Sequence, residues 1–167
     1  MKKILIALDY DPTAQKVAET GHDLAKALNG TTILLHVTSD VTQYSYLDYS
    51  PIMGFGGLSA IEKDQPGISE RLEDVAQQYL DNAKETLGDE KVQTIVRNGE
   101  YGEAILATAM EIKADIIVMG THGRRGLEKI LMGSVAENVL RHSSIPILII
   151  PTKGLAHNDT KGQATRN

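Results

Sequence analysis

A glycine-rich segment in the last third of the chain has the residue types of an anion-binding loop. From Gly120 to Ser134 it reads Gly-Thr-His-Gly-Arg-Arg-Gly-Leu-Glu-Lys-Ile-Leu-Met-Gly-Ser. Glycine lets the backbone turn through positive φ, and it lets main-chain amides approach a ligand without a Cβ in the way. A helix that begins near Ser134 would add free N–H groups and a partial positive charge. The segment differs from both a Walker A loop and a G-x-G-x-x-G fingerprint.

Four side chains of this segment could add contacts. Ser134 could cap the helix or donate to a phosphate, and Arg124 and Arg125 could screen the remaining negative charge. His122 could contact a phosphate or a base, or could be a solvated loop histidine. The glycines could equally form only a flexible connection between a strand and a helix. These residues by themselves therefore leave a binding role and a structural role open.

Asp9 is a second candidate, because it directly follows the first apolar run of the chain. A carboxylate at that place could coordinate Mg²⁺ or Mn²⁺ together with phosphate oxygens, since hard cations take oxygen ligands. The alternative is a simple loop acid. The remaining histidines have no metal-ligand spacing and are predicted to be structural or exposed; they are His22, His36, His142 and His157. Cysteine is absent from the sequence, which excludes disulfides and thiolate metal sites.

The elements that would position these residues are short apolar runs separated by helical patterns. Four runs are continuous and rich in Ile, Leu and Val, which is typical of strands buried on both faces of a parallel sheet. They are residues 4–8, 32–37, 116–119 and 147–150. A fifth run, residues 92–96, alternates more and is predicted to be an edge strand.

Apolar residues recur with helical spacing between these runs. The predicted helices cover residues 12–28, about 72–87, about 101–113, and a stretch that starts near residue 134. Asp11 is the predicted N-cap of the first helix, with Pro12 at its first position. Strands that alternate with helices predict a single-domain α/β fold with a doubly wound parallel sheet. Ligands bind such sheets beyond the carboxyl ends of the strands, here just after Leu8, Val37 and Met119.

Composition limits the choice of partner and location. A chain of 167 residues with 41% hydrophobic and 23% charged residues fits one folded domain. Its net charge of −5 provides no basic face, so nucleic acid is not expected as a partner. The first apolar run is too short for a signal peptide, and no run approaches the roughly 18 apolar residues of a membrane span. We therefore expect a cytoplasmic protein without membrane insertion.

Two segments fall outside the alternating pattern. Residues 38–67 form a predicted irregular insertion that is rich in tyrosine and glycine, and it could be a lid or a surface for an unknown protein partner. Residues 152–167 are polar, have no periodicity and are predicted to be a disordered tail.

The glycine segment also carries a resemblance to a known family. The pattern Gly120-x2-Gly123-x9-Gly133-Ser134 matches the G-2x-G-9x-G-(S/T) nucleotide motif of the universal stress protein family. The flanking residues 114–120 and 133–150 resemble the family as well, and the resemblance spans residues 1–151.

This resemblance implies a five-stranded parallel sheet in the order 3-2-1-4-5 and a homodimer formed through the last strand, residues 146–150. It implies that ATP, ADP or AMP binds with its phosphates on the glycine loop and on the helix that begins at Ser134. Asp9 would lie near the ribose, the phosphates or a bound Mg or Mn ion, and Val37 would line the adenine pocket. The expected cofactor-binding residues are Ala7, Asp9, Val37, Gly120, His122, Gly123, Arg124, Gly126, Gly133, Ser134 and Val135, with Asp9 as the metal ligand.

The sequence departs from the family after the first strand. Many members read Asp-Gly-Ser where this chain reads Asp9-Tyr10-Asp11, which puts the pose of the ligand in question. The function that the resemblance implies is an ATP-binding stress-response or signalling protein. It would act as a dimeric, nucleotide-dependent switch, with at most slow ATP hydrolysis or autophosphorylation and no assigned catalytic residue. The alternatives are an ATP-cleaving enzyme of related architecture and a partner-binding protein that does not need nucleotide.

Overall fold

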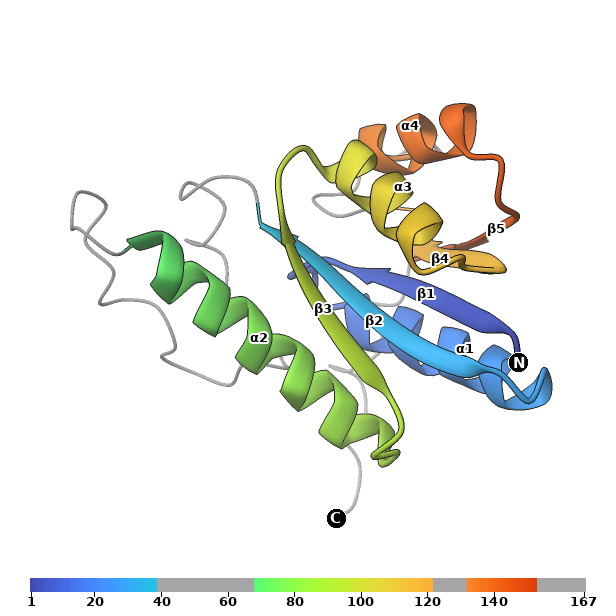
Figure 1. The fold of residues 1–167 in the computed structure, drawn as a ribbon, viewed down its shortest axis with the longest axis horizontal. Helices are drawn as coiled ribbons and strands as arrows, with labels where there is room; N and C mark the ends of the chain where they lie inside the picture. The colour runs from blue at the N-terminus through green and yellow to red at the C-terminus, as the bar shows by residue number, and fades with distance from the viewer. Residues whose placement is uncertain (39–67, 122–131, 153–167) are drawn as a thin grey trace, which may run out of the picture.

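The computed structural model describes residues 1–38, 68–121 and 132–152. Within these ranges five strands alternate with four helices (Figure 1). The strands are β1 (Lys3–Leu8), β2 (Thr31–Thr38), β3 (Gln93–Asn98), β4 (Ile116–Gly120) and β5 (Ile147–Ile150). The helices are α1 (Ala14–Ala27), α2 (Ile68–Leu87), α3 (Tyr101–Glu111) and α4 (Ser134–His142).

All five strands lie parallel in one sheet with the order β3-β2-β1-β4-β5. This confirms the fold class, the strand order and the edge position predicted for residues 92–96. β1 is the central strand: Leu8 aligns with His36 of β2, and Ile6 aligns with Val118 of β4. The chain moves from β1 to β2 on one side and later returns to β4 on the other side. The strand order therefore reverses between β1 and β4.

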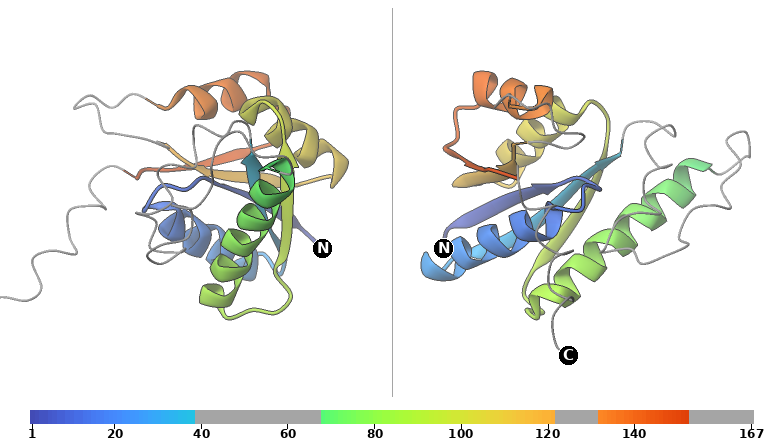
Figure 2. Two further views of the ribbon diagram at one scale, coloured as in Figure 1. Left: turned by 90° about the vertical axis from the view of Figure 1, so that its left-hand side faces the viewer. Right: turned by 180° about the vertical axis from the view of Figure 1, so that it is seen from behind.

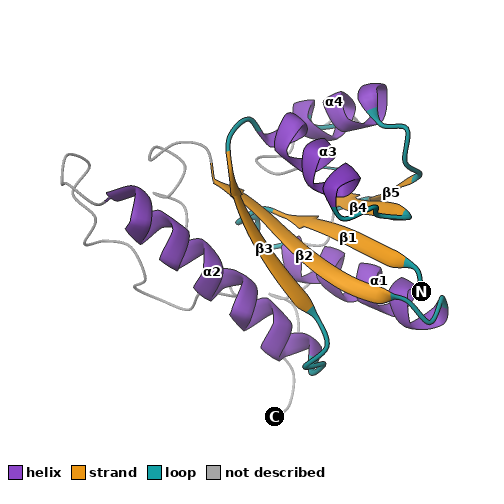
Figure 3. Cartoon of the chain, in the orientation of Figure 1, coloured by secondary structure: helices purple, strands orange, loops and turns teal. Residues whose placement is uncertain are grey.

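The helices cover both faces of the sheet. α1 and α2 lie on one face and α3 and α4 on the other (Figure 2), and Figure 3 shows the same layers by element type. Side chains of β1 alternate between the two hydrophobic clusters, with Ile6 and Leu8 on the α1 and α2 side and Leu5 on the α3 and α4 side. Because both sides of β1 are buried, its sequence is a continuous apolar run.

The start of α1 differs from the prediction. The N-cap is Thr13, and the helix begins at Ala14, so the assignment of Asp11 as N-cap is wrong. The Asp11 carboxylate instead accepts a hydrogen bond from the Thr13 main-chain N–H at 2.8 Å, while the Ala14 N–H donates to the Asp11 carbonyl at 2.9 Å. The carboxylate thus closes a turn that precedes the helix, a local alternative that aspartate offers as readily as a cap.

Most of the predicted insertion and tail lies outside the described residues. Thr38 is the one described residue of the segment 38–67, and Thr152 is the one described residue of the segment 152–167. In the ranges that the structure covers, no helix is both long enough and apolar enough to cross a membrane.

We predict that Gly21 is required where α1 crosses the sheet. A Cβ at this position would lie 2.6 Å from Cδ1 of the fully buried Ile6. Gly21→Ala should therefore lower the free energy of unfolding by about 1 kcal/mol, because overpacking outweighs the gain in helix propensity. In an Ile6→Ala background, Gly21→Ala should raise the free energy of unfolding by about 1 kcal/mol. The helix-propensity gain remains there, and the clash with the Ile6 side chain is gone. Urea titrations of the four proteins measure this cycle, and equal effects in both backgrounds would contradict it.

Candidate functional site

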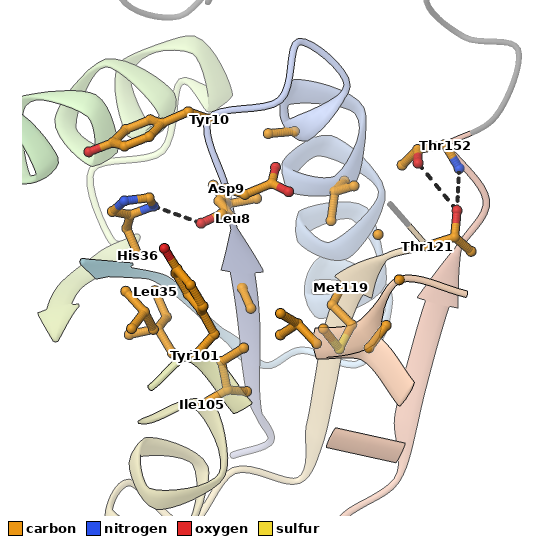
Figure 4. A pocket seen from close by; sticks show the side chains of 18 of the residues that line it. Leu8, Asp9, Tyr10, Leu35, His36, Tyr101, Ile105, Met119, Thr121 and Thr152 are labelled. Carbon is orange, nitrogen blue, oxygen red and sulfur yellow. Dashed lines mark hydrogen bonds between the residues drawn. The ribbon is translucent and has the colours of Figure 1, made fainter. Parts of the chain in front are cut away.

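A cavity of about 420 Å³ lies at the carboxyl ends of β1, β2 and β4 (Figure 4). Its volume is within the range of small-molecule sites. The N-terminal residues of α3 and α4 complete the lining, together with the first turns of α1. The cavity thus lies where the strand order reverses, which is the place that the sequence predicts for a ligand.

The structure brings together, around this cavity, all the predicted ligand-binding residues that it describes. They are Ala7, Asp9, Val37, Gly120, Gly133, Ser134 and Val135. The other four, His122, Gly123, Arg124 and Gly126, lie outside the described residues. That these side chains and amides contact a ligand stays a prediction.

The residues on either side of the undescribed glycine segment are joined by hydrogen bonds. The Gly133 N–H donates to the Thr121 carbonyl at 2.7 Å, and the Thr121 N–H donates to the Ile150 carbonyl at 3.0 Å. The Thr152 N–H donates to the Thr121 hydroxyl oxygen at 3.1 Å (Figure 4). These bonds fix the end of β4 against the start of α4 and the end of β5.

Thr152 was assigned to the predicted tail, but it is a buried residue of the cavity wall. Its methyl carbon would lie 3.0 Å from a Cβ placed on Gly120. Glycine at position 120 therefore permits the close approach of the chain that follows β5. A single hydrogen-bonded residue after a strand makes no periodic pattern, so the sequence gives no signal for it.

Helix α4 begins at the cavity with a main-chain geometry suited to an anion. Its N-cap is Gly133, and Ser134 is its first residue, so the structure does not support the capping role that was left open for Ser134. The N–H groups of the first helical turn have no acceptor within the helix. Ser134, Val135 and Ala136 all line the cavity, which places these N–H groups and the positive end of the helix dipole at its wall.

Asp9 also lines the cavity, one residue beyond β1. Its Oδ1 accepts a hydrogen bond from the Asp11 main-chain N–H at 3.1 Å. In Figure 4 the Asp9 carboxylate and the Tyr10 ring point in opposite directions. Among the residues that the structure describes there is no group of three or more His, Asp or Glu side chains that could hold a metal ion. A single carboxylate fits a Mg²⁺ or Mn²⁺ ion that is bound mainly by phosphate oxygens and water.

An aromatic cluster beside Asp9 was not identified from the sequence. The ring of His36 lies 4.2 Å from that of Tyr10 and 5.4 Å from that of Tyr79, measured between ring centroids. His36 Nδ1 lies 2.8 Å from the Leu8 carbonyl oxygen, and the Tyr79 hydroxyl donates to the Asp9 carbonyl oxygen. His36 was predicted to be structural or exposed. Its side chain is buried, and it reaches the cavity.

Burial determines the charge of both hydrogen-bonding residues. It lowers the pKa of His36 to about 4, and the hydrogen bond with the Leu8 carbonyl opposes this only in part. His36 is therefore neutral at pH 7, and the carbonyl acceptor requires the tautomer with its proton on Nδ1. Burial also raises the pKa of Tyr79 well above its ordinary value, and the charges of Asp9 and Asp11 raise it further. Its hydroxyl thus stays protonated and remains a donor.

Tyr10 stands at the position where the Asp-Gly-Ser pattern has glycine. Its side chain is 9% exposed and belongs to the hydrophobic cluster of α1 and α2. Its ring packs against His36 and lies edge-on to Tyr79, with 4.8 Å between the centroids of the two tyrosines. The larger residue therefore adds mainly to the core on the side of the chain opposite the Asp9 carboxylate.

Comparisons with known proteins agree with this architecture. A model described as the universal stress protein family matches residues 1–151. Universal stress protein MJ0577 of Methanocaldococcus jannaschii is 32% identical over 155 residues, which cover 91% of this chain and 96% of that protein. A solved structure of MJ0577 superposes with a TM-score of 0.68, over 91% of this chain and 96% of that one.

Two further solved structures have the same fold at lower identity. A universal stress protein in complex with cAMP has a TM-score of 0.59 and 19% identity, covering 90% of this chain and 96% of its own. The universal stress protein from Archaeoglobus fulgidus in complex with dAMP has a TM-score of 0.56 and 16% identity, covering 90% and 98%. At these identities the likeness concerns the fold.

The buried state of His36 predicts a dependence of stability on pH. An unfolded histidine takes up its proton near pH 6.5, whereas the folded pKa of His36 is about 4. The contribution of neutral His36 to the free energy of unfolding should be complete above pH 6.5. It should fall by up to about 3 kcal/mol as the pH is lowered toward 4. Unfolding by urea at several pH values, compared with His36→Asn, measures it. Parallel pH profiles for the two proteins would contradict the prediction.

Proposed function

This chain belongs to the universal stress protein family, and on that premise we propose that it binds an adenine nucleotide at the carboxyl ends of β1, β2 and β4. One observation carries the proposal. The described residues of the glycine motif, Gly120, Gly133 and Ser134, line a single cavity together with Asp9 and Val37, which come from separate strand ends. Residues so far apart in sequence meet only because the sheet is doubly wound.

The lining of the cavity is divided in a way that suits a nucleotide. Leu35, Ile105 and Met119 form an apolar side (Figure 4), where a purine base can be held away from water. Ser134 and the first turn of α4 form a polar side with main-chain donors for phosphate. The solved relatives in complex with cAMP and with dAMP support a nucleotide in this fold.

ATP is the nucleotide that we propose, with Mg²⁺ or Mn²⁺ bound between its phosphates and Asp9. The ion would compensate the charge of the phosphates and of the carboxylate. Asp9 is the one acidic residue in the described lining, and no lysine or arginine occurs there. Arg124 and Arg125, which could also screen the phosphates, lie outside the described residues.

We further propose that the protein holds ATP as a switch in stress response or signalling, and that it hydrolyses ATP slowly or not at all. The described cavity wall offers two candidate bases, Asp9 and His36. His36 is a weak base at a pKa of about 4, and its Nδ1 faces the Leu8 carbonyl. Such a lining favours binding over turnover. The cytoplasmic location, and the 38–67 segment as a lid or as a surface for a protein partner, stay predictions.

The test of nucleotide binding is calorimetric titration with ATP, ADP, AMP and cAMP, with and without Mg²⁺. We expect micromolar binding of ATP and no multiple turnover. Ala7→Leu should weaken binding by at least about 10-fold, because the larger side chain enters the cavity. Ala27→Leu, at the exposed end of α1, is the matched control and should bind like wild type. Absence of binding for all four nucleotides would contradict the proposal.

We also propose a homodimer that forms through residues 146–150. β5 is an edge strand that pairs with β4, and its Leu148 side chain is 37% exposed. An apolar edge strand with unpaired main-chain groups is a ready site for association with a second chain.

Leu148→Lys should convert the dimer to a monomer, because it places a charge at the proposed interface. Met110→Lys is the control, since Met110 is 65% exposed on α3, away from the sheet edge. Light scattering after gel filtration measures both masses. A dimer that survives Leu148→Lys, or one that is lost equally in both variants, would count against this interface.

A further inference from the structure

Two buried side chains hold the main chain on both sides of the Asp9 Cα. His36 Nδ1 donates to the Leu8 carbonyl at 2.8 Å, and the Tyr79 hydroxyl donates to the Asp9 carbonyl. Each carbonyl belongs to one of the two planar peptide units that flank this Cα. When both units are held, φ and ψ of the residue between them are held as well. The direction of the Cα–Cβ bond of Asp9 is then fixed.

The sheet provides this restraint only on the Leu8 side, where Leu8 is paired with His36 in the ladder with β2. The register of β1 with β2 ends at the pair Leu8 and His36, and its register with β4 ends at the pair Ile6 and Val118. Asp9 lies beyond both ladders. His36, at the last registered position, uses its side chain to bind the carbonyl at the end of β1, and α2 supplies Tyr79 for the next one. Side chains thus extend the hydrogen bonding of β1 by one residue.

The two donors are well suited to fixing a backbone. Tyr79 is fully buried and His36 is 4% exposed, so water could not readily replace either hydrogen bond if it were lost. The rings also restrain one another, because Tyr10 packs against both.

The side chain of Asp9 follows from this backbone geometry. Leu8 and Tyr10 belong to the hydrophobic cluster of α1 and α2, and Ala7 packs against the opposite cluster. Alternation therefore directs Asp9 to the side of Ala7, and both residues line the cavity. The Asp11 N–H then donates to Asp9 Oδ1 at 3.1 Å and orients the carboxylate.

We propose that His36 and Tyr79 are positioning residues of the nucleotide site, which hold the Asp9 carboxylate toward the cavity and thereby set how strongly a divalent cation enhances nucleotide binding. The inference rests on the proposed function, and it concerns residues outside the glycine motif. His36 on β2 and Tyr79 on α2 would affect the ligand through Asp9.

The first experiment needs no ligand. The Asp11 amide reports the direction of the carboxylate, because it donates to Asp9 Oδ1. In Tyr79→Phe, which removes one oxygen, hydrogen exchange of this amide measured by NMR should become on the order of 10-fold faster. Thr32→Val is the matched control, because it removes a buried hydroxyl that lies 2.9 Å from His22 at the other end of β2. In Thr32→Val the Asp11 amide should exchange as in wild type.

The second experiment measures the ratio of the ATP dissociation constants in EDTA and in Mg²⁺. Tyr79→Phe and His36→Leu should lower this ratio by on the order of 10-fold, which is typical when a group that orients a metal ligand is lost. His36→Asn should keep much of the wild-type ratio, because the amide nitrogen of the asparagine can take the place of His36 Nδ1. Asp9→Asn should remove the enhancement, and Tyr79→Phe should then have no further effect on it.

The outcomes separate this inference from its premise. A wild-type protein that binds no adenine nucleotide would overturn the proposed function and the cation effect together. A wild-type protein that binds ATP more tightly with Mg²⁺, while Tyr79→Phe and His36→Leu keep the wild-type ratio, would overturn the positioning role alone. An unchanged Asp11 exchange rate in Tyr79→Phe would also overturn it. A further decrease of the ratio when Tyr79→Phe is added to Asp9→Asn would also overturn the positioning role.

Discussion

β1 shares hydrogen-bonded ladders with β2 and β4, so each of its side chains must face one of two helical layers. Ile4, Leu5 and Ile6 are all completely buried, which shows that both layers are closely packed against this strand. A shift of one residue would exchange the two sets of side chains and would turn the residue after Leu8 toward the layer of α1 and α2. The registers with both neighbouring strands therefore determine which side of the sheet receives the Asp9 carboxylate, and the position of the cavity walls follows from the same alignment.

The two faces of the sheet make different contributions to the site. The face of α1 and α2 supplies Tyr79 and, through β2, His36, which bind the main chain beyond β1. The face of α3 and α4 supplies the apolar wall and the first turn of α4. The end of β4 is fixed in a comparable way, but by main-chain groups: the Thr121 carbonyl accepts from the Gly133 N–H at 2.7 Å. In both places the chain just beyond a strand is held by hydrogen bonds from outside the ladders, and rigid strand ends of this kind suit a preorganised site.

The parts that the sequence predicts are those with a repeating or contiguous signal. The apolar run at residues 4–8 predicts a strand buried on both faces, and the spacing over residues 12–28 predicts α1. The alternation of strands and helices predicts a doubly wound sheet, and with it which strand ends line the cavity. His36 and Tyr79 are not predictable in this way, because their acceptors lie 28 and 70 residues away and the contacts exist only after the layers have formed. The place of Thr152 in the cavity wall is not predictable for the same reason. The assignment of Asp11 as N-cap is wrong because an aspartate side chain can close a local turn as well as cap a helix.

Charge balance connects the positioning of Asp9 with the proposed ligand. A carboxylate that is held toward a cavity cannot turn away when an anion enters, so a rigid Asp9 would repel a triphosphate more than a mobile one would. The described lining contains no lysine or arginine, and Arg124 and Arg125, which could screen the phosphates, lie outside the described residues. A divalent cation held by Asp9 would turn the repulsion into attraction, and rigidity would then be an advantage because the proposed metal ligand would already be in place. The uncharged pair His36 and Tyr79 thus suits a site in which the cation and the nucleotide bind together.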